Sequence, residues 1–469
     1  MQVFLQGNIV GGSDFAEAYG SHLNSLGGSC LYVSLLSEAL PRGLLAHLKL
    51  SDELIGSSGG GQFLVLLPAE SIPAAHAFLT EVTRRMAAFS DSRLRLIWAA
   101  TENLGAWSDV RRRLDQELNR WAGLSALEPE NVFGAFTPGA DAERWLGRLF
   151  EQLPESAAAV LDLNAPGLLL RGGEPHPVAT HRALNDAGDA PASLEELGKR
   201  ASGRSAWGIL RGEIDLYETR LRRAQSVEEY LPLTAFFKPF FTGEVQVLCT
   251  QGEFWRKVTV LSAGGGGFAV AGAWDALIEF AREMQRLYHR TAEEVLRDAP
   301  GPEAKTMSMG LALAPSLDAS PAAVWAGAGR QLRVAKAAAR DAVSIFGRVL
   351  DSKQLAEASD LKNLMLRLVD EFGANPQFLG ELGAFYRETD RVLPARNAAR
   401  QPEASQRPWR LHRRLNRVLD SEGRPREFQK ARAAVQAAFL TRGQGQLKLK
   451  PSGRVALEWA KLAKEAEQE

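Results

Sequence analysis

The sequence predicts an α+β protein in which two ferredoxin-like domains, related by internal duplication, precede an all-α region. Two motif pairs indicate the duplication. "SSGGGQF" begins at Ser57 and "SAGGGGF" begins at Ser262, 205 residues later. "VFLQGNI" begins at Val3 and "GILRGEI" begins at Gly208, again 205 residues later. Two motifs that share one offset indicate a repeat more strongly than either motif alone.

Each repeat contains the same order of elements. A strand ends in a polar residue, Asn8 in the first repeat and Glu213 in the second, and a helical stretch follows. Next come a strand–glycine turn–strand hairpin and an amphipathic helix, expected over 72–89 and 274–296. A third strand follows, and a last helix closes the unit. This β-α-β-β-α-β order is the ferredoxin-like, palm arrangement.

The chain length and composition shifts divide the protein into four regions. We expect a first palm at 1–125, a linker with a helical insert at 126–195, a second palm at 196–350 and a helical region at 351–469. Several prolines and glycines near the end of the linker predict a loop there.

Composition and charge exclude several classes of protein. Lys+Arg and Asp+Glu both number 56, so the net charge is zero, which argues against whole-molecule attraction to nucleic acid but allows local patches. The two cysteines, Cys30 and Cys249, form no CxxC pair, which excludes a zinc ribbon and favours a reducing compartment. No apolar run is long enough to span a membrane, so we expect a cytoplasmic protein without membrane partners.

At this level of detail the sequence resembles the large signature subunit of type III CRISPR effector complexes (Csm/Cmr type). The second repeat resembles that family's cyclase-type palm, and the first repeat resembles its non-catalytic palm. The resembling segments of the second repeat are "ASLEELGKRASGRSAWGILRGEIDLY", "LPLTAFFKPFF", "VTVLSAGGGGFAVAGAWDALIEFAREM" and "RQLRVAKAAARDAVSIFGRVL". Those of the first repeat are "FLQGNIVGGSDFAEAYGSHLNSLGGSCLYVSLLSEAL" and "GSSGGGQFLVLLP".

The glycine turn departs from the family pattern. Active members carry a GGDD turn, whose two aspartates hold divalent metals together with aspartates of an Asp-Val-Asp motif on the first strand. Gly264 and Gly265 match the two glycines, whereas Gly266 and Gly267 occupy the aspartate positions and supply no ligand. The resemblance therefore implies a degenerate palm.

Other positions of that site are partly retained. Glu213 and Asp215 stand in the first-strand motif and are the remaining candidates for a metal site. Lys336 matches a phosphate-contacting lysine, and Arg340 and Asp341 stand where a Lys-Asn pair is usual. The candidate nucleotide-binding residues are Gly264, Gly265, Lys336 and Arg340. The family's HD nuclease domain and cysteine zinc ribbon have no counterpart in this sequence.

The missing aspartates predict loss of catalysis. Nucleotidyl transfer needs metals about 3.5–4 Å apart, and Mg²⁺ needs hard oxygen ligands in near-octahedral geometry. Two carboxylates without the hairpin pair would hold at most one weakly bound ion. We therefore expect no resident cofactor, and at most weak binding of Mg²⁺ and ATP.

A basic segment in the helical region is a candidate site for RNA or a partner. Residues 400–432 contain ten Lys/Arg and four Asp/Glu. Its arginines lie mostly off the apolar stripe of Leu411, Leu415 and Leu419, so they could follow a phosphate backbone, or they could form a solvated face. The candidate residues are Arg410, Arg413, Arg414 and Arg417.

The resemblance implies a non-catalytic structural large subunit of a type III CRISPR antiviral complex. It would cap the 5′ end of the guide crRNA and dock small helical subunits along the guide–target RNA, beside a repeat-tag-binding subunit and backbone subunits. One alternative is a residual nucleotide-binding palm with weak cyclic oligoadenylate synthase activity. Another is a free-standing pseudo-palm that binds nucleotide as a regulator.

Overall fold

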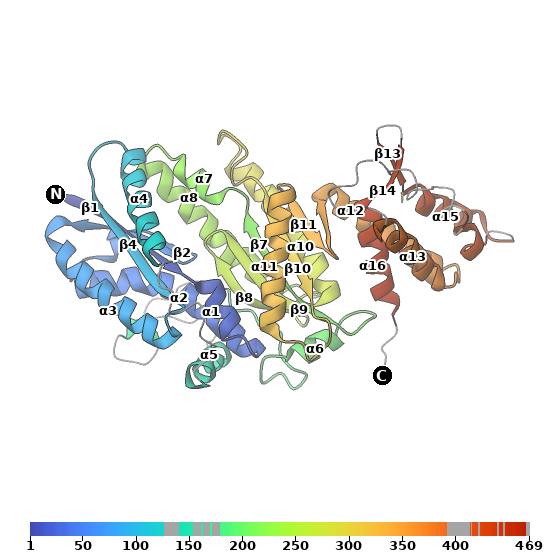
Figure 1. The fold of residues 1–469 in the computed structure, drawn as a ribbon, viewed down its shortest axis with the longest axis horizontal. Helices are drawn as coiled ribbons and strands as arrows, with labels where there is room; N and C mark the ends of the chain where they lie inside the picture. Colours follow the sequence, from blue (N-terminus) through green and yellow to red (C-terminus); the bar gives the residue numbers. More distant parts are fainter. Residues whose placement is uncertain are drawn as a thin grey trace.

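The computed structural model describes residues 1–125, 140–152, 161–162, 169–170, 179–391, 413, 415–420, 423–438, 440–443 and 446–465. The molecule is elongated. The first repeat lies at one end, the second repeat lies in the middle, and the helical region forms the other end (Figure 1).

The first palm is built on an antiparallel sheet with strand order β2-β3-β1-β4. Its strands are β1 (Gln2–Val10), β2 (Ile55–Gly59), β3 (Gln62–Pro68) and β4 (Arg95–Glu102). Its helices are α1 (Gly12–Ala18), α2 (Leu23–His47), α3 (Ile72–Ser90) and α4 (Trp107–Ser125), with short 3₁₀ turns at Asp52–Leu54 and Ala69–Ser71. Successive side chains of β1 point to opposite faces of the sheet: Leu5 packs in the core with α2 and α3, and Phe4 packs with α4.

The second palm repeats this plan and adds a hairpin. Its sheet has the order β12-β11-β10-β7-β9-β8. Its strands are β7 (Trp207–Ile214), β8 (Val258–Gly264), β9 (Gly267–Ala273), β10 (Met307–Leu313), β11 (Ala342–Ile345) and β12 (Arg348–Asp351). Its helices are α7 (Tyr217–Arg222), α8 (Val227–Pro239), a π-helical turn (Phe240–Glu244), α9 (Val245–Cys249), α10 (Trp274–Val295) and α11 (Pro321–Ala338).

Helices α10 and α11 cover opposite faces of this sheet. Leu210 of β7 packs with Leu277 of α10, and the adjacent Ile209 packs in a separate cluster with Trp325 of α11. The two palms therefore share both the strand order and the arrangement of helices, and the duplication predicted from the sequence is confirmed.

The palms pack against each other through two apolar clusters. One joins α1 and α2 of the first palm, through Ala16 and Leu26, to the α11 face of the second sheet. The other joins the α4 face of the first sheet, through Phe4 and Trp107, to Tyr230 of α8. Each palm thus contributes its outer sheet face to one cluster and its first helices to the other, as expected for two copies related by a pseudo-twofold axis.

The region between the palms is only partly described. Within it, α5 (Ala140–Gln152) packs on α2, where a Cβ on Gly28 would lie 1.9 Å from the carbonyl oxygen of Leu146. The other elements are β5 (Leu161–Asp162), β6 (Leu169–Leu170) and α6 (Leu194–Lys199). The helical insert expected inside the linker thus belongs structurally to the first palm.

The C-terminal region is helical, as expected, and shares a continuous core with the second palm. Its helices are α12 (Ser352–Asp370), α13 (Gln377–Arg391), α15 (Arg426–Ala438) and α16 (Pro451–Lys464). A capping box between Asp351 and Gln354 starts α12 directly after β12. The region also contains a hairpin, β13 (Leu440–Gly443) and β14 (Gln446–Leu449), which the expectation of an all-α region omitted.

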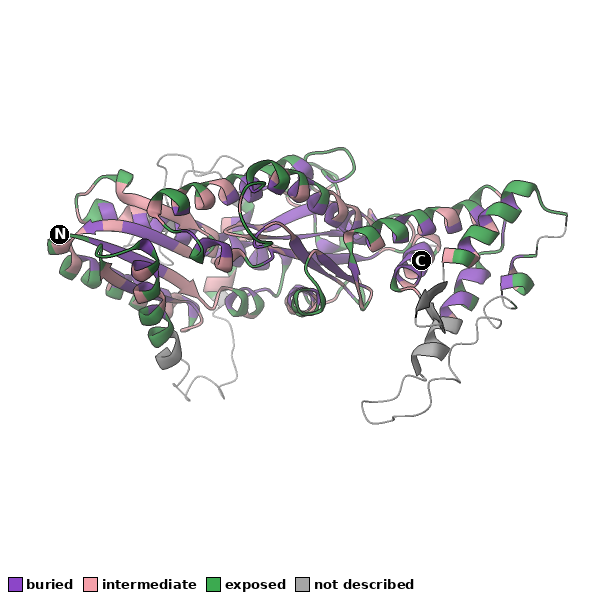
Figure 2. Ribbon diagram, turned by 90° about the horizontal axis from the view of Figure 1, so that it is seen from above, coloured by how far each residue is buried: buried purple, intermediate pink, exposed green. Residues whose placement is uncertain are grey.

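Figure 2 shows buried residues concentrated in the two sheets and on the inward faces of the helices. None of the described helices has both the length and the apolar character needed to cross a membrane.

Candidate functional site

The glycine turns of the two palms meet at the interface between them. Gly59 pairs with Gln62 at the end of the first hairpin, and Gly264 pairs with Gly267 at the end of the second. A Cβ built on Gly60 would lie only 2.4 Å from the Cα of Gly265. Residues 60 and 265 differ by the repeat offset of 205, so each is the other's equivalent and the pseudo-twofold axis passes between them.

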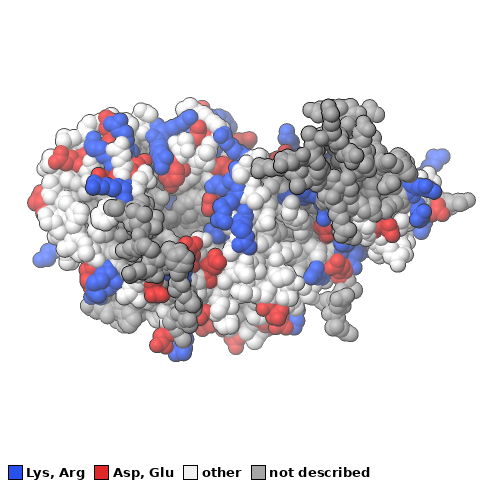
Figure 3. Space-filling view, in the orientation of Figure 1, with Lys and Arg blue, Asp and Glu red and all other residues white. Residues whose placement is uncertain are grey.

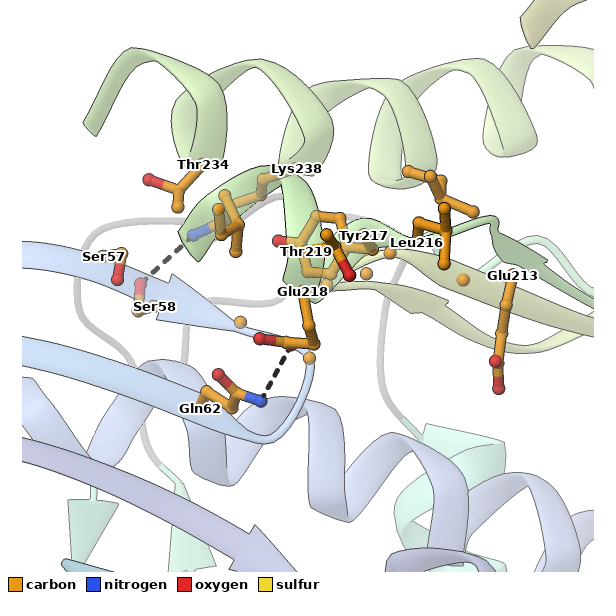
Figure 4. A pocket seen from close by; sticks show the side chains of 18 of the residues that line it. Ser57, Ser58, Gln62, Glu213, Leu216, Tyr217, Glu218, Thr219, Thr234 and Lys238 are labelled. Atoms are coloured by element: carbon orange, nitrogen blue, oxygen red, sulfur yellow. Dashed lines mark hydrogen bonds between the residues drawn. The ribbon is translucent and has the colours of Figure 1, made fainter. Parts of the chain in front are cut away.

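A cavity of about 530 Å³, which we call the inter-palm cavity, opens beside this contact (Figure 4). Both hairpins, α7, α8 and the end of α11 form its walls. The lining residues used below are Ser58, Gly60, Glu213, Tyr217, Lys238, Gly264, Gly265, Gly266, Gly267 and Lys336.

A second cavity of about 270 Å³, the counterpart cavity, lies on the other side of the contact. The residues that line the two cavities correspond through the duplication. Ile9, Gly12 and Val33 line the counterpart cavity, and their equivalents in the second repeat line the inter-palm cavity: Ile214, Tyr217 and Lys238. Each of these pairs differs by 205 residues. The two cavities are therefore equivalent in origin and different in chemistry.

The two charged candidates at the inter-palm cavity form an ion pair with each other. The ammonium group of Lys336 donates to Oε2 of Glu213 at 2.6 Å. Both side chains are partly exposed, at 37% and 45%. Figure 4 shows Glu213 on the opposite side of the drawn cavity from Ser58 and Lys238. An anionic ligand would have to compete with Glu213 for Lys336.

Asp215 has a structural role in this arrangement. It is buried, and its carboxylate accepts hydrogen bonds from Thr306 Oγ1 at 2.8 Å, from Ser308 Oγ at 2.7 Å and from the backbone N–H of Asp341 at 2.9 Å. It does not line the inter-palm cavity. The expected metal pair of Glu213 and Asp215 therefore does not form: one carboxylate faces the cavity and the other is turned into the fold.

Asp341 continues this network toward the helical region. Its carboxylate accepts from Ser352 Oγ at the start of α12 and from Gln285 of α10, and it lies 2.7 Å from Nε2 of His289. The hydrogen bond with Asp341 raises the pKa of His289 above its ordinary value, against an opposing effect of burial. The pair thus links α10 to the start of the β11–β12 hairpin, which leads into α12.

The donor set does not fit two divalent cations. Among the residues that the structure describes, no three His, Cys, Asp or Glu side chains come together as metal ligands. Glu213 is the only first-strand carboxylate facing the cavity, and Lys336 already neutralises it.

The space for the missing aspartates is also closed. A Cβ on Gly267 would lie 2.7 Å from the carbonyl oxygen of Gly212 and 3.1 Å from Cγ of Glu213. A Cβ on Gly266 would lie 3.0 Å from the ring of Tyr217. At Gly267 the backbone of Gly212 would have to shift, and at Gly266 the Tyr217 ring would have to give by a few tenths of an ångström. In the present arrangement neither position accepts an aspartate without movement of a neighbour.

A buried inter-palm ion pair forms another wall of the cavity. Lys238 of α8 donates to Glu38 of α2 at 2.7 Å, and Ser58 of β2 donates to the other oxygen of Glu38 at 2.8 Å. Burial raises the pKa of Glu38, but the charge of Lys238 and these hydrogen bonds outweigh it, so the pKa lies below its ordinary value. Neither residue was predicted from the sequence, where the one signal is a single lysine inside the apolar run "LTAFFKPFF".

The remaining candidates lie elsewhere. Arg340 is exposed just after α11 and lines neither of the two cavities. Arg413 and Arg417 are exposed, while Leu415 and Leu419 are buried, which agrees with the predicted faces of that helix. Arg410 and Arg414 lie outside the described residues.

Known proteins with this architecture were found by comparison of both sequence and structure. No protein-family model matches the chain. A curated relative, the "CRISPR system single-strand-specific deoxyribonuclease Cas10/Csm1 (subtype III-A)" of Thermococcus onnurineus (strain NA1), is 25% identical over 113 residues, which is 21% of this chain and 14% of that protein.

Solved structures match over nearly the whole chain. The Csm1–Csm4 cassette in complex with cA4 gives a TM-score of 0.69 at 16% identity, covering 99% of this chain and 70% of that one. The same cassette with AMPPNP gives 0.68 at 16% identity, with the same coverage. Csm1 of T. onnurineus gives 0.68 at 16% identity, covering 99% of this chain and 69% of that one. The chain therefore has the fold of Csm1, and one stretch of its sequence is similar to Cas10/Csm1, in agreement with the resemblance of its palm motifs.

Proposed function

We propose that the chain is a non-catalytic, architectural large subunit of a type III CRISPR RNA-guided complex. The observation that supports it is a palm pair of the Csm1 fold whose hairpin tip lacks the carboxylates of a two-metal centre and would accept them only if Gly212 or Tyr217 moved. A palm without two metals cannot both activate a hydroxyl and stabilise a leaving pyrophosphate. Without catalysis, the function left to the protein is that of a scaffold made of two packed palms and a helical region.

In this role the protein caps the 5′ end of the guide crRNA beside a repeat-tag-binding subunit, and its helical region docks small subunits along the guide–target RNA. The second palm and the helical region share one hydrophobic core, so the two parts are packed together. This packing supports a role in which the palm and the helical region act as one scaffold. The matching structures include Csm1 bound to Csm4, which supports a partner of the same class.

Two measurements test the proposal. Affinity purification from the native host, followed by mass spectrometry and RNA sequencing, should recover other type III subunits and guide RNA. The purified complex should form no linear or cyclic oligoadenylate from ATP with target RNA and Mn²⁺, with an active family member as positive control. Oligoadenylate above a no-enzyme blank, or purification without type III subunits, would contradict it.

A second candidate function is that of a residual nucleotide-binding palm. The observation that favours it is the cavity between the palms. The inter-palm cavity keeps about 530 Å³ and two lysines, Lys238 and Lys336. The ion pair of Lys336 with Glu213 makes this function testable. If the triphosphate binds Lys336 without metal, Glu213→Gln should tighten ATP binding, because it removes the competing carboxylate. If binding needs Mg²⁺ held by Glu213, the same change should weaken it.

Calorimetric titration with ATP, with Mg²⁺ and with EDTA, separates these cases. No measurable heat in either buffer, for wild type and variant, would leave the cavity without a nucleotide function.

A further inference from the structure

The exposed side of α11 carries a run of cations without acidic residues. Between Pro321 and Ala338 the helix contains Arg330, Arg333 and Lys336 and no Asp or Glu. Arg330 and Arg333 are exposed, and Lys336 follows one turn later at the edge of the inter-palm cavity. Figure 3 shows a band of Lys and Arg side chains over this part of the molecule. We call Arg330, Arg333 and Lys336 the α11 basic face.

Lys336 is paired with Glu213, but the other two positive charges of this face are not compensated locally. Neither Arg330 nor Arg333 forms an ion pair with a carboxylate in the described part of the chain. Beneath them, Arg211 of β7 stacks on the ring of Trp325 at 4.1 Å and donates a hydrogen bond to the hydroxyl of Ser13 at 3.3 Å. Burial lowers the pKa of Arg211; the charge of Glu213 opposes this shift, and the charge of Arg333 adds to it. In a protein with no net charge, this helix is a local concentration of like charge.

The surroundings of these arginines do not suit a protein partner. Between and beside them lie Val334, Ala337 and Ala338, which are exposed and include no aromatic side chain. Protein interfaces obtain most of their binding energy from large buried anchors, chiefly Trp, Tyr and Arg in well-packed pockets. A phosphodiester backbone needs only cations at regular intervals, and successive cations three residues apart on a helix lie about 4.5 Å apart along its axis.

We propose that the α11 basic face binds the phosphodiester backbone of an RNA strand that passes the mouth of the inter-palm cavity. This inference extends the proposed function, since it says where on the second palm RNA lies. It adds a contact site that is separate from the basic helix of the C-terminal region. Arg330 and Arg333 make the phosphate contacts, and Lys336 remains available to the cavity.

The test is binding of a fluorescein-labelled single-stranded RNA of about 20 nucleotides by the purified full chain, measured by anisotropy across a salt series. The test variant is R330E/R333E, which leaves Lys336 and both cavities unchanged. The matched control is R290E/R297E, since both arginines are exposed on the α10 side of the second palm, across the sheet, and form no ion pair with a described carboxylate.

Each lost phosphate contact on a single strand reduces the slope of log K against log salt by about 0.7, so the test variant should lose about 1.4. Between 50 and 200 mM salt, the wild-type affinity should then fall about sevenfold more than that of R330E/R333E. The control should match the wild type, and circular dichroism should be the same for all three proteins.

An unchanged slope in R330E/R333E would overturn the inference. Loss of a protein subunit from the complex with an unchanged RNA slope would also overturn it, and would assign the face to an acidic protein. Failure of the proposed function looks different: the chain would purify without type III subunits, while R330E/R333E would still weaken RNA binding.

Discussion

The contact between the two glycine tips gives a quantitative prediction for Gly265→Ala. The new Cβ would lie 2.5 Å from the Cα of Gly60, whereas packed carbon atoms lie about 3.5–4.0 Å apart. The palms would therefore have to separate by about 1 Å at the tip. Overpacking of this kind destabilises by about 1–3 kcal/mol. The positive φ of 67° at residue 265 adds about 1–2 kcal/mol for any residue with a Cβ.

Gly61→Ala separates these two effects. Gly61 also has a positive φ, of 82°, but its Cβ would meet only the carbonyl oxygen of Ile9, at 3.4 Å. Both variants carry the backbone cost, and only Gly265→Ala carries the inter-palm clash. Their free energies of unfolding should therefore differ by about 1–3 kcal/mol.

Thermal unfolding followed by circular dichroism measures the difference, at about 2–4 °C per kcal/mol for a domain of 150–250 residues. Gly60→Ala should behave like Gly265→Ala, and the double variant should lose less than the sum, because both changes act on one contact. Equal melting temperatures for Gly265→Ala and Gly61→Ala would show that the tips do not touch in solution, and would refute the face-to-face arrangement.

Three further predictions follow from the site and the helical region. The double change Gly266→Asp and Gly267→Asp should not restore oligoadenylate synthesis and should lower the melting temperature; chromatography of ATP reactions with Mn²⁺ and a thermal melt check both. Because the pKa of His289 is raised in the folded state, its contribution to stability is fully present below about pH 6.5 and is lost as the pH rises through the folded-state value. His289→Gln should therefore flatten the decline in melting temperature between pH 6 and pH 8, and an equally steep decline in the variant would contradict the pairing. Charge reversal of Arg413 and Arg417, which are exposed, should weaken assembly at low salt without loss of helical signal, whereas equal assembly at two salt concentrations would assign them to a solvated face.

The sequence was sufficient to predict the repeated fold, because strand–turn–strand geometry is local. The offset of 205 residues placed Gly264 opposite Gly267, as Gly59 is opposite Gln62, and the structure pairs them in this way. The need for glycine in a tight turn depends only on the backbone of the few residues that form the turn. A repeated glycine motif therefore predicts a repeated turn.

The fate of the first-strand carboxylates could not be predicted in the same way. Glu213 and Asp215 look equivalent in sequence. The environment of Asp215, however, comes from residues about 90 to 126 positions away: Thr306, Ser308 and Asp341. Strand β7 ends at Ile214, so Asp215 is free to turn into the fold. Side-chain roles set by distant partners need the tertiary structure, and the ion pair of Lys238 with Glu38 escaped prediction for the same reason.

The shared walls of the two cavities have a further consequence. Gly60, Glu213, Gly264 and Gly267 line both of them. A molecule that moved the hairpins from one side would change the walls of the other cavity as well, because the same residues form both. Because both copies lie in one chain, the two cavities have different side chains at equivalent positions. The inter-palm cavity has lysine at position 238, and the counterpart cavity has valine at position 33. Occupancy of either chamber would therefore be sensed by the other without any contact between the occupants.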